Sequence, residues 1–153
     1  MFKYLWFWVA VVVLPLVVVG AHASRLPAPG CTALYRADAH FKTEAQTISV
    51  EVAKSPAELA RGLSGRACIS SDQAMLFEFN RPGYYQFWMK EMRFSIDMVW
   101  LDSAWRVVTV RSSVLPKTYP QTFTSSRPAQ YVLELTAGWA YQLGISEGSL
   151  LQP

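Results

Sequence analysis

The chain has 153 residues, a formal net charge of +3 and 52% hydrophobic residues. This length suits one ordinary domain with a real core. The sequence has no run of Lys and Arg that would indicate a nucleic-acid-binding or polybasic membrane-binding surface, so we expect a near-neutral globular domain with no nucleic-acid partner.

The first 23 residues have the layout of a signal peptide. A short positive region precedes an uncharged, mostly apolar run over residues 4–20, and small residues then form a cleavage signal between Ala23 and Ser24. The alternative is an uncleaved membrane anchor over the same run, which is somewhat short for a spanning helix and contains Pro15. Either interpretation places the rest of the chain outside the cytoplasm, in the periplasm or the extracellular space. The only membrane contact expected is through this N-terminal segment, if it is not cleaved.

The two cysteines, Cys31 and Cys68, are predicted to form a disulfide. An even pair of cysteines in an exported protein is first a disulfide. A nucleophilic Cys68 is the weaker alternative, because only Arg66 stands near it in the sequence to favour the thiolate.

Residues 24–46 are interpreted as a linker that runs into an edge segment. In Thr47–Lys54 apolar and polar residues alternate, which predicts a half-buried strand. The sequence SPAE over Ser55–Glu58 then has the pattern of a capping box with proline at the first helical position. This pattern predicts a short helix that ends at Gly62 or Gly65.

The rest of the chain is predicted to be mainly strand. A turn is expected over residues 80–83, a long surface loop over Leu115–Pro128, and a short helix that Thr136 caps and that ends near Gly144. The six further strands expected are Met75–Phe79, Tyr84–Met89, Ile96–Leu101, Trp105–Arg111, Tyr131–Leu135 and Ser149–Leu151. Six to seven strands with two short helices indicate a mainly β domain over residues 47–153, either a small closed barrel or a jelly-roll-like sandwich.

Five motifs follow one another between Val50 and Leu151: VEVAKSPAELARGLSGR, MLFEF, FWMK, IDMVWLD, and YVLEL with a glycine three residues later. In this combination and order the chain resembles the domain-of-unknown-function 192 family of small bacterial and archaeal proteins. The resemblance covers about two thirds of the chain. It implies a compact β-barrel or jelly-roll-like domain, and it implies no reaction.

Asp97 stands inside an apolar run, where an unpaired carboxylate is strongly disfavoured. We therefore expect it to pair with a cation, and Arg61, Arg66 and Lys90 are available. Two hypotheses stay open for this carboxylate. It is either a ligand-binding or catalytic group, or a structural ion pair or hydrogen bond that holds a turn.

Arg61 and Arg66 lie across the end of the predicted helix and could hold an anion by forked hydrogen bonds, or they could pair with nearby acids or lie on the surface. Trp88, Tyr84 and Trp100 could form a platform for a sugar or another flat ligand. Aromatic residues at a spacing of two in a β domain are more often core, so only an exposed one would count.

Glu134 faces either inward or outward in its predicted strand. Together with Asp97 it could form a carboxylate pair of the glycosidase type, with Lys90 as an electrostatic group. This pair supports the alternative function, a carboxylate-based hydrolase or lyase that acts on an envelope glycan or a similar substrate.

The first hypothesis is a non-enzymatic module that binds a small ligand, a glycan or an envelope protein. His40 is the only histidine after cleavage, and it precedes the predicted domain. The domain therefore has no histidine for a catalytic triad or a histidine-based metal site. No phosphate-binding loop or dinucleotide fingerprint is present, and we predict no metal and no cofactor. The candidate binding residues are Arg61, Arg66, Trp88, Lys90, Glu91, Asp97 and Glu134.

Overall fold

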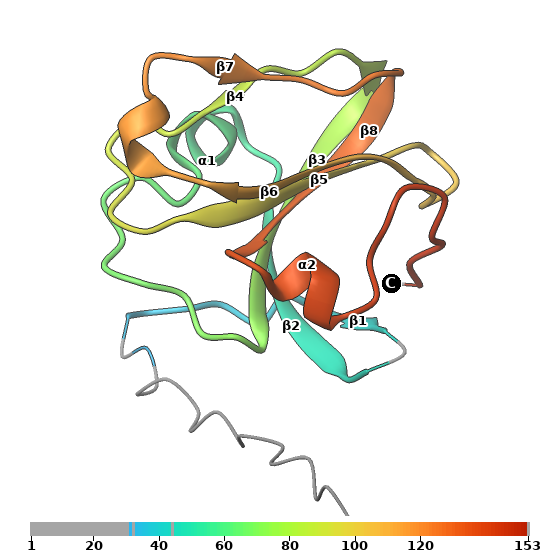
Figure 1. Cartoon of the computed structure of the whole chain (residues 1–153), viewed down its shortest axis with the longest axis horizontal. Helices are drawn as coiled ribbons and strands as arrows, with labels where there is room; N and C mark the ends of the chain where they lie inside the picture. The colour runs from blue at the N-terminus through green and yellow to red at the C-terminus, as the bar shows by residue number, and fades with distance from the viewer. Residues whose placement is uncertain (1–30, 32, 44, 153) are drawn as a thin grey trace, which may run out of the picture.

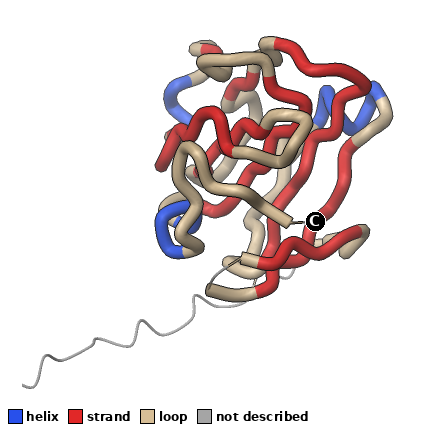
Figure 2. The backbone as a smooth tube through the Cα atoms, turned by 90° about the vertical axis from the view of Figure 1, so that its right-hand side faces the viewer, coloured by secondary structure: helices blue, strands red, loops and turns tan. Residues whose placement is uncertain are grey.

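A computed structural model describes residues 31, 33–43 and 45–152 of the chain (Figures 1 and 2). The predicted signal peptide, its cleavage between Ala23 and Ser24 and the start of the predicted linker lie outside these residues. Within the described ranges, no helix is long and apolar enough to cross a membrane.

The described residues form a mainly β domain, as predicted, with eight strands, two short α-helices and one 3-10 helix. Figure 2 shows the strands as the body of the domain, with the helices at its outside. In chain order the elements are β1 Ala39–Lys42, β2 Thr47–Ala53, α1 Pro56–Arg61, β3 Gln73–Gly83, β4 Phe87–Trp88, β5 Ile96–Leu101, β6 Val107–Val114, η1 Pro116–Thr118, β7 Thr122–Phe123, β8 Ala129–Thr136 and α2 Trp139–Gln142.

Six of the strands form one sheet in the order β1-β2-β3-β8-β5-β6, in which only β2 and β3 are parallel. The two edge strands β1 and β6 do not pair with each other, so the sheet is not a closed barrel. Instead, the C-terminal segment makes single bridges to both sides, Lys42 with Gln152 and Arg106 with Leu150. Of the two architectures predicted, the sandwich-like one fits.

The large sheet buries apolar side chains on both faces, because successive residues of a strand point to opposite sides. One face lies under α2 and the C-terminal segment, and the other lies under α1, β4 and β7 (Figure 1). All six residues of β5 are buried, as expected for a strand covered on both faces. The largest buried side chains on the α2 face are Phe41, Ile48, Leu101, Leu133, Leu135 and Leu143, and those on the α1 face are Leu63, Phe77, Met89, Ile96, Met98 and Trp100.

The predicted capping box starts α1. The Ser55 hydroxyl accepts a hydrogen bond from the Glu58 backbone N–H, and the Glu58 carboxylate accepts one from the Ser55 backbone N–H at 3.0 Å. The helix ends at Gly62, whose φ of +50° lies in the left-handed region. A Cβ at this position would also stand 3.0 Å from the ring of Phe77, so both backbone and packing favour glycine there.

Several segments differ from the predicted elements, among them Ser149–Leu151, which makes only an isolated bridge at Leu150. The stretch Tyr84–Met89 is not a central strand, because only Phe87–Trp88 pairs, and it pairs with β7 in a separate two-stranded sheet. β7 itself lies in the segment predicted as a surface loop. The turn predicted over residues 80–83 is instead the end of the eleven-residue β3, which passes an irregularity in its pairing with β8.

The start of α2 also differs from the prediction. Thr136 does not cap the helix, since its hydroxyl donates to the Ile69 carbonyl at 3.2 Å and the residue before the helix is Gly138. The predicted disulfide between Cys31 and Cys68 is confirmed, and it joins the segment before β1 to the loop after α1.

Candidate functional site

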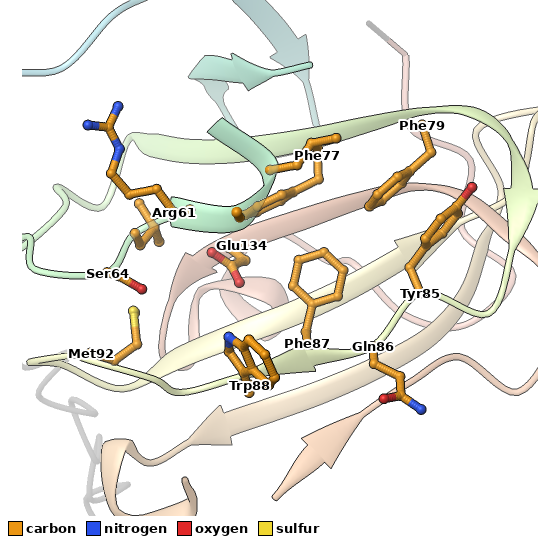
Figure 3. A pocket seen from close by; sticks show the side chains of 14 residues that line it. Arg61, Ser64, Phe77, Phe79, Tyr85, Gln86, Phe87, Trp88, Met92 and Glu134 are labelled. Atoms are coloured by element: carbon orange, nitrogen blue, oxygen red, sulfur yellow. The ribbon is translucent and has the colours of Figure 1, made fainter. Parts of the chain in front are cut away.

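A pocket of about 230 Å³ opens on the α1 face of the sheet, between α1, the loop that follows it, β3 and the chain around β4 (Figure 3). We call it the Glu134 pocket, after the acid whose carboxyl group points into it. Its lining residues are Leu59, Ala60, Arg61, Gly62, Leu63, Ser64, Phe77, Phe79, Tyr85, Gln86, Phe87, Trp88, Met92 and Glu134.

Glu134 comes from β8, the strand between β3 and β5. It stands opposite Met75 on one neighbouring strand and Met98 on the other, so its flanks on the sheet are apolar. Its side chain is buried, with 4% of the residue exposed, and no described residue donates a hydrogen bond or an ion pair to its carboxyl oxygens. This burial raises the pKa of Glu134 to about 8, because an ionised carboxylate loses its hydration there.

The walls of the pocket are aromatic rings that hold one another in place. Phe79 stacks on Tyr85 with centroids 3.5 Å apart, and Phe87 meets Phe77 edge-to-face at 4.8 Å. The Tyr85 hydroxyl donates a hydrogen bond to the Arg81 backbone carbonyl at 2.7 Å, so the polar end of this side chain is bound to the main chain of β3. These contacts give the pocket a preformed apolar wall.

Trp88 forms the exposed rim of the pocket, with 51% of its surface accessible, and its ring meets Tyr119 edge-on at 6.5 Å. It is the one member of the predicted aromatic platform that lines the pocket. Trp100 is fully buried core and donates its indole N–H to the Tyr85 carbonyl at 3.4 Å, while Tyr84 is exposed outside the pocket. The three residues therefore do not form a platform.

Lys90 and Glu91 lie beside the pocket with exposed side chains that are not part of its lining. Their backbone carbonyls accept hydrogen bonds from the Ser64 hydroxyl at 2.8 Å and from the Gly65 N–H at 3.0 Å. Glu91 has a φ of +56°. The main chain of these two predicted site residues thus binds the loop after α1. That loop forms one wall of the pocket.

Asp97 is fully buried on the other face of the sheet, and our expectation of a cation partner is wrong. Its carboxylate accepts three backbone hydrogen bonds, from Ser113 at 2.7 Å, Gly138 at 3.0 Å and Ala140 at 2.9 Å. Carboxylates accept strong hydrogen bonds from backbone N–H groups. The N–H groups of Ser113, Gly138 and Ala140 therefore compensate the buried carboxylate in place of a cation. The arrangement is the hydrogen-bonded structural alternative.

The predicted carboxylate pair of Asp97 and Glu134 is excluded by strand register. Asp97 stands opposite Leu135, and Glu134 stands opposite Met98, so the two acids point to opposite faces of the same sheet. A glycosidase-type pair needs both carboxyl groups on one substrate. The structure therefore leaves Glu134 as a single acid in its pocket.

Arg66 and Arg61 do not form an anion site together. One terminal nitrogen of Arg66 donates to both carboxylate oxygens of the largely buried Glu51, at 2.7 and 2.8 Å, and Arg36 also approaches this carboxylate at 3.6 Å. Arg61 is exposed at the edge of the Glu134 pocket, and its guanidinium points away from Glu134 (Figure 3). Of the predicted site residues, the structure brings Arg61, Trp88 and Glu134 to one pocket.

Most of the apolar lining was not predicted from the sequence. Phe77 and Phe79 share one face of β3, and Tyr85 and Phe87 share one face of the next segment, so a spacing of two was the available signal. That signal does not say which strands are neighbours. Met92, from the turn after β4, had no periodic signal at all.

A second hollow of about 410 Å³ lies beside the C-terminal segment, and its described lining contains no acid. Elsewhere in the described chain, no group of three or more His, Cys, Asp or Glu is placed to hold a metal ion. The Glu134 pocket is thus the site whose chemistry is most distinctive.

Comparison with known proteins gives one family and two similar structures. The model of the family DUF192, described as "Uncharacterized ACR", matches residues 39–153. A crystal structure from Sinorhizobium meliloti 1021, described as a candidate transcription regulator, has 30% sequence identity and a TM-score of 0.67 over 74% of this chain and 89% of its own. A protein of unknown function from Novosphingobium aromaticivorans DSM 12444 has 25% identity and a TM-score of 0.68 over 74% of this chain and 82% of its own. No curated protein matches the chain.

Proposed function

The chain belongs to the DUF192 family, and from this premise we propose that it is an exported, non-enzymatic domain that binds a small ligand in the Glu134 pocket. One observation carries the proposal. A preformed concave pocket with aromatic walls has a single buried carboxyl group at its floor, and no described residue satisfies that group. Ligand sites of small molecules typically combine mostly apolar walls with a few polar groups of this kind.

Export is supported by the disulfide. Structural disulfides are typical of secreted and periplasmic proteins and rare in the reducing cytosol, and the Cys31–Cys68 bridge is part of the folded domain. The signal-like residues 1–23 agree with this, and cleavage after Ala23 would release the domain.

Binding is favoured over catalysis by the isolation of Glu134. Glycoside hydrolysis of the usual kind needs a second carboxyl group within reach of the substrate. Among the described residues, Asp97 is the buried acid of the neighbouring strand β5, and it is held by three backbone N–H groups on the opposite face. Lys90, the third group of the enzyme hypothesis, is exposed outside the pocket.

A thermal-shift screen tests the proposed function. The purified full chain is incubated with metabolites, glycan fragments, metal salts and small amines, and compounds that raise the melting temperature are taken to calorimetry. Trp88→Ala removes the rim of the pocket and should weaken a pocket ligand about tenfold, the usual effect of removing an aromatic contact. Tyr141→Ala is the matched control, since Tyr141 is 84% exposed on α2 and does not line the pocket.

Ligands that lose affinity in Trp88→Ala and keep it in Tyr141→Ala support the pocket as the binding site. A screen without any stabilising compound contradicts the proposal. So does a set of ligands, glycans included, that bind both variants as tightly as the unmodified chain, because their site lies elsewhere.

A further inference from the structure

We propose that the ligand of the Glu134 pocket is a small organic cation, an ammonium or guanidinium group on a short apolar body. The inference rests on the proposed function and adds the ligand class to it. It follows from what the pocket offers and from what the chain itself does not supply to the carboxyl group.

Glu134 is buried and has no partner among the described residues. Its residue is 4% exposed, its carboxyl group points into the pocket, and no described residue pairs with it (Figure 3). A carboxylate in such a place is unfavourable until an opposite charge or hydrogen-bond donors reach it. Gly62 lies beside this group, since a Cβ added there would be in ordinary contact with a Glu134 carboxyl oxygen, at 4.0 Å.

The walls of the Glu134 pocket are rich in aromatic side chains. Aromatic ring faces attract cations through the ring quadrupole, and pockets of several rings are a common way to hold ammonium groups. Figure 3 shows Phe87 and Trp88 beside the carboxyl group of Glu134, with Phe77 on another side. An anion would be repelled by an ionised Glu134, whereas a cation is attracted by the carboxylate and by any ring face that it meets.

Among the described residues, none supplies a positive charge to the carboxyl group of Glu134. The other titratable side chains of the lining are Arg61 from α1 and Tyr85 from the segment before β4. Arg61 is exposed with its guanidinium turned away, and the Tyr85 hydroxyl donates to a main-chain carbonyl. The neighbours of Glu134 on β3 and β5 are the uncharged Met75 and Met98. A positive charge that pairs with Glu134 must therefore come with the ligand.

Cation binding should depend on pH in a defined direction. Burial raises the pKa of Glu134 to about 8, so in the empty pocket at neutral pH the group holds a proton that a cation must displace. Affinity for a cation then rises as pH rises towards about 8 and levels off above it. A ligand that accepts a hydrogen bond from the protonated acid shows the opposite trend.

The experiment uses three probes that share a benzyl group and differ in charge. They are benzylguanidinium, its neutral isostere benzylurea, and the anion phenylacetate, each titrated calorimetrically into the full chain at constant ionic strength. At about pH 8.5 benzylguanidinium should bind about tenfold or more tightly than benzylurea, because only the cation adds an opposite charge to its hydrogen bonds with the carboxylate. Between about pH 8.5 and 6.5 its affinity should fall roughly 20-fold, as expected for one proton with a pKa near 8.

Glu134→Gln is the decisive variant, because it keeps the shape of the side chain and removes its charge. It should abolish both the preference for benzylguanidinium and its pH dependence. Glu147→Gln is the matched control, with the same chemical change at an exposed acid outside the pocket lining. Circular dichroism of Glu134→Gln confirms that the variant is folded.

Three outcomes would overturn the inference: equal or tighter binding of benzylurea or phenylacetate, an affinity for benzylguanidinium that Glu134→Gln leaves unchanged, and no binding of any probe. They are distinguishable from failure of the proposed function. If the ligand screen yields compounds that depend on Trp88, the pocket remains a binding site and only the cation class is lost.

Discussion

Two buried acids with the same carboxylate chemistry have different surroundings in this domain. Asp97 accepts three backbone N–H groups, while Glu134 meets methionine and aromatic side chains and no described donor. Burial without hydrogen-bond donors disfavours the ionised form of Glu134. At the scale of single residues, the donors within reach decide which acid is structural and which is available to a ligand.

The pH dependence of stability follows from Glu134. Its pKa is about 8 in the folded chain against an ordinary 4.5, so between these values the folded state holds a proton that the unfolded state has lost. Its contribution to the free energy of unfolding therefore falls as pH rises from about 4.5 to 8, by up to about 5 kcal/mol in total. Urea denaturation across this window should show a weaker fall in Glu134→Gln than in the unmodified chain. Parallel curves for the two proteins would contradict the prediction, and Glu147→Gln should behave as the unmodified chain.

At the scale of elements, α2 depends on a side chain from another strand. The helix has only four residues, and neither Gly138 nor Thr136 caps it by a side chain. Asp97 of β5 binds the N–H groups of Gly138 and Ala140 and also that of Ser113 on β6. One carboxylate thus connects the helix to two strands, and this explains why an acid is tolerated among six buried strand residues.

Asp97→Asn should therefore destabilise the domain whether or not it affects binding. The amide has no charge and offers one oxygen to the three donors, so we expect a loss of about 2–4 kcal/mol in the free energy of unfolding. Urea denaturation gives the value. Asp72→Asn, at an exposed position, should stay close to the unmodified chain. An unchanged midpoint for Asp97→Asn would show that the three hydrogen bonds are not made in solution.

At the scale of the whole molecule, the large sheet has an apolar layer packed on each face. The segment before β1 is fixed to this domain by covalent and polar contacts. The disulfide joins residues 37 apart in the chain, and Arg66 on the same loop binds Glu51 of β2. The Tyr35 hydroxyl adds hydrogen bonds to the main chain of Ser49 and Ala74, and burial raises the pKa of Tyr35 to about 12. These contacts hold the segment before β1 against the domain.

Reduction of the disulfide should lower the melting temperature. A bridge that closes a loop of this length restrains the unfolded chain by about 4 kcal/mol at most in the entropy model. Differential scanning calorimetry with and without reductant measures the effect. The double variant Cys31→Ser with Cys68→Ser is the control, since its melting temperature should not respond to reductant. Two titratable thiols in the untreated protein, or no response in it, would contradict the bridge.

The sequence by itself was enough for the features that depend on local patterns. Alternation over Thr47–Lys54 predicted β2, and the residues SPAE with a following glycine predicted α1 with its cap. The even cysteine count with a signal-like start predicted the disulfide, and five ordered motifs predicted the family. Each of these signals lies within one segment or in a simple count.

Only the tertiary structure decided what the acids do. A spacing of two shows that neighbouring residues of a strand point to opposite sides, but it does not show what covers either side. Placing β8 between β3 and β5 put Glu134 under α1 and β4, and put Asp97 under the N–H groups of α2. The sequence placed Asp97 in a buried strand and left open whether Glu134 points inward or outward. The strand order, which arises from contacts between distant segments, determined that one holds a helix and the other faces an open pocket.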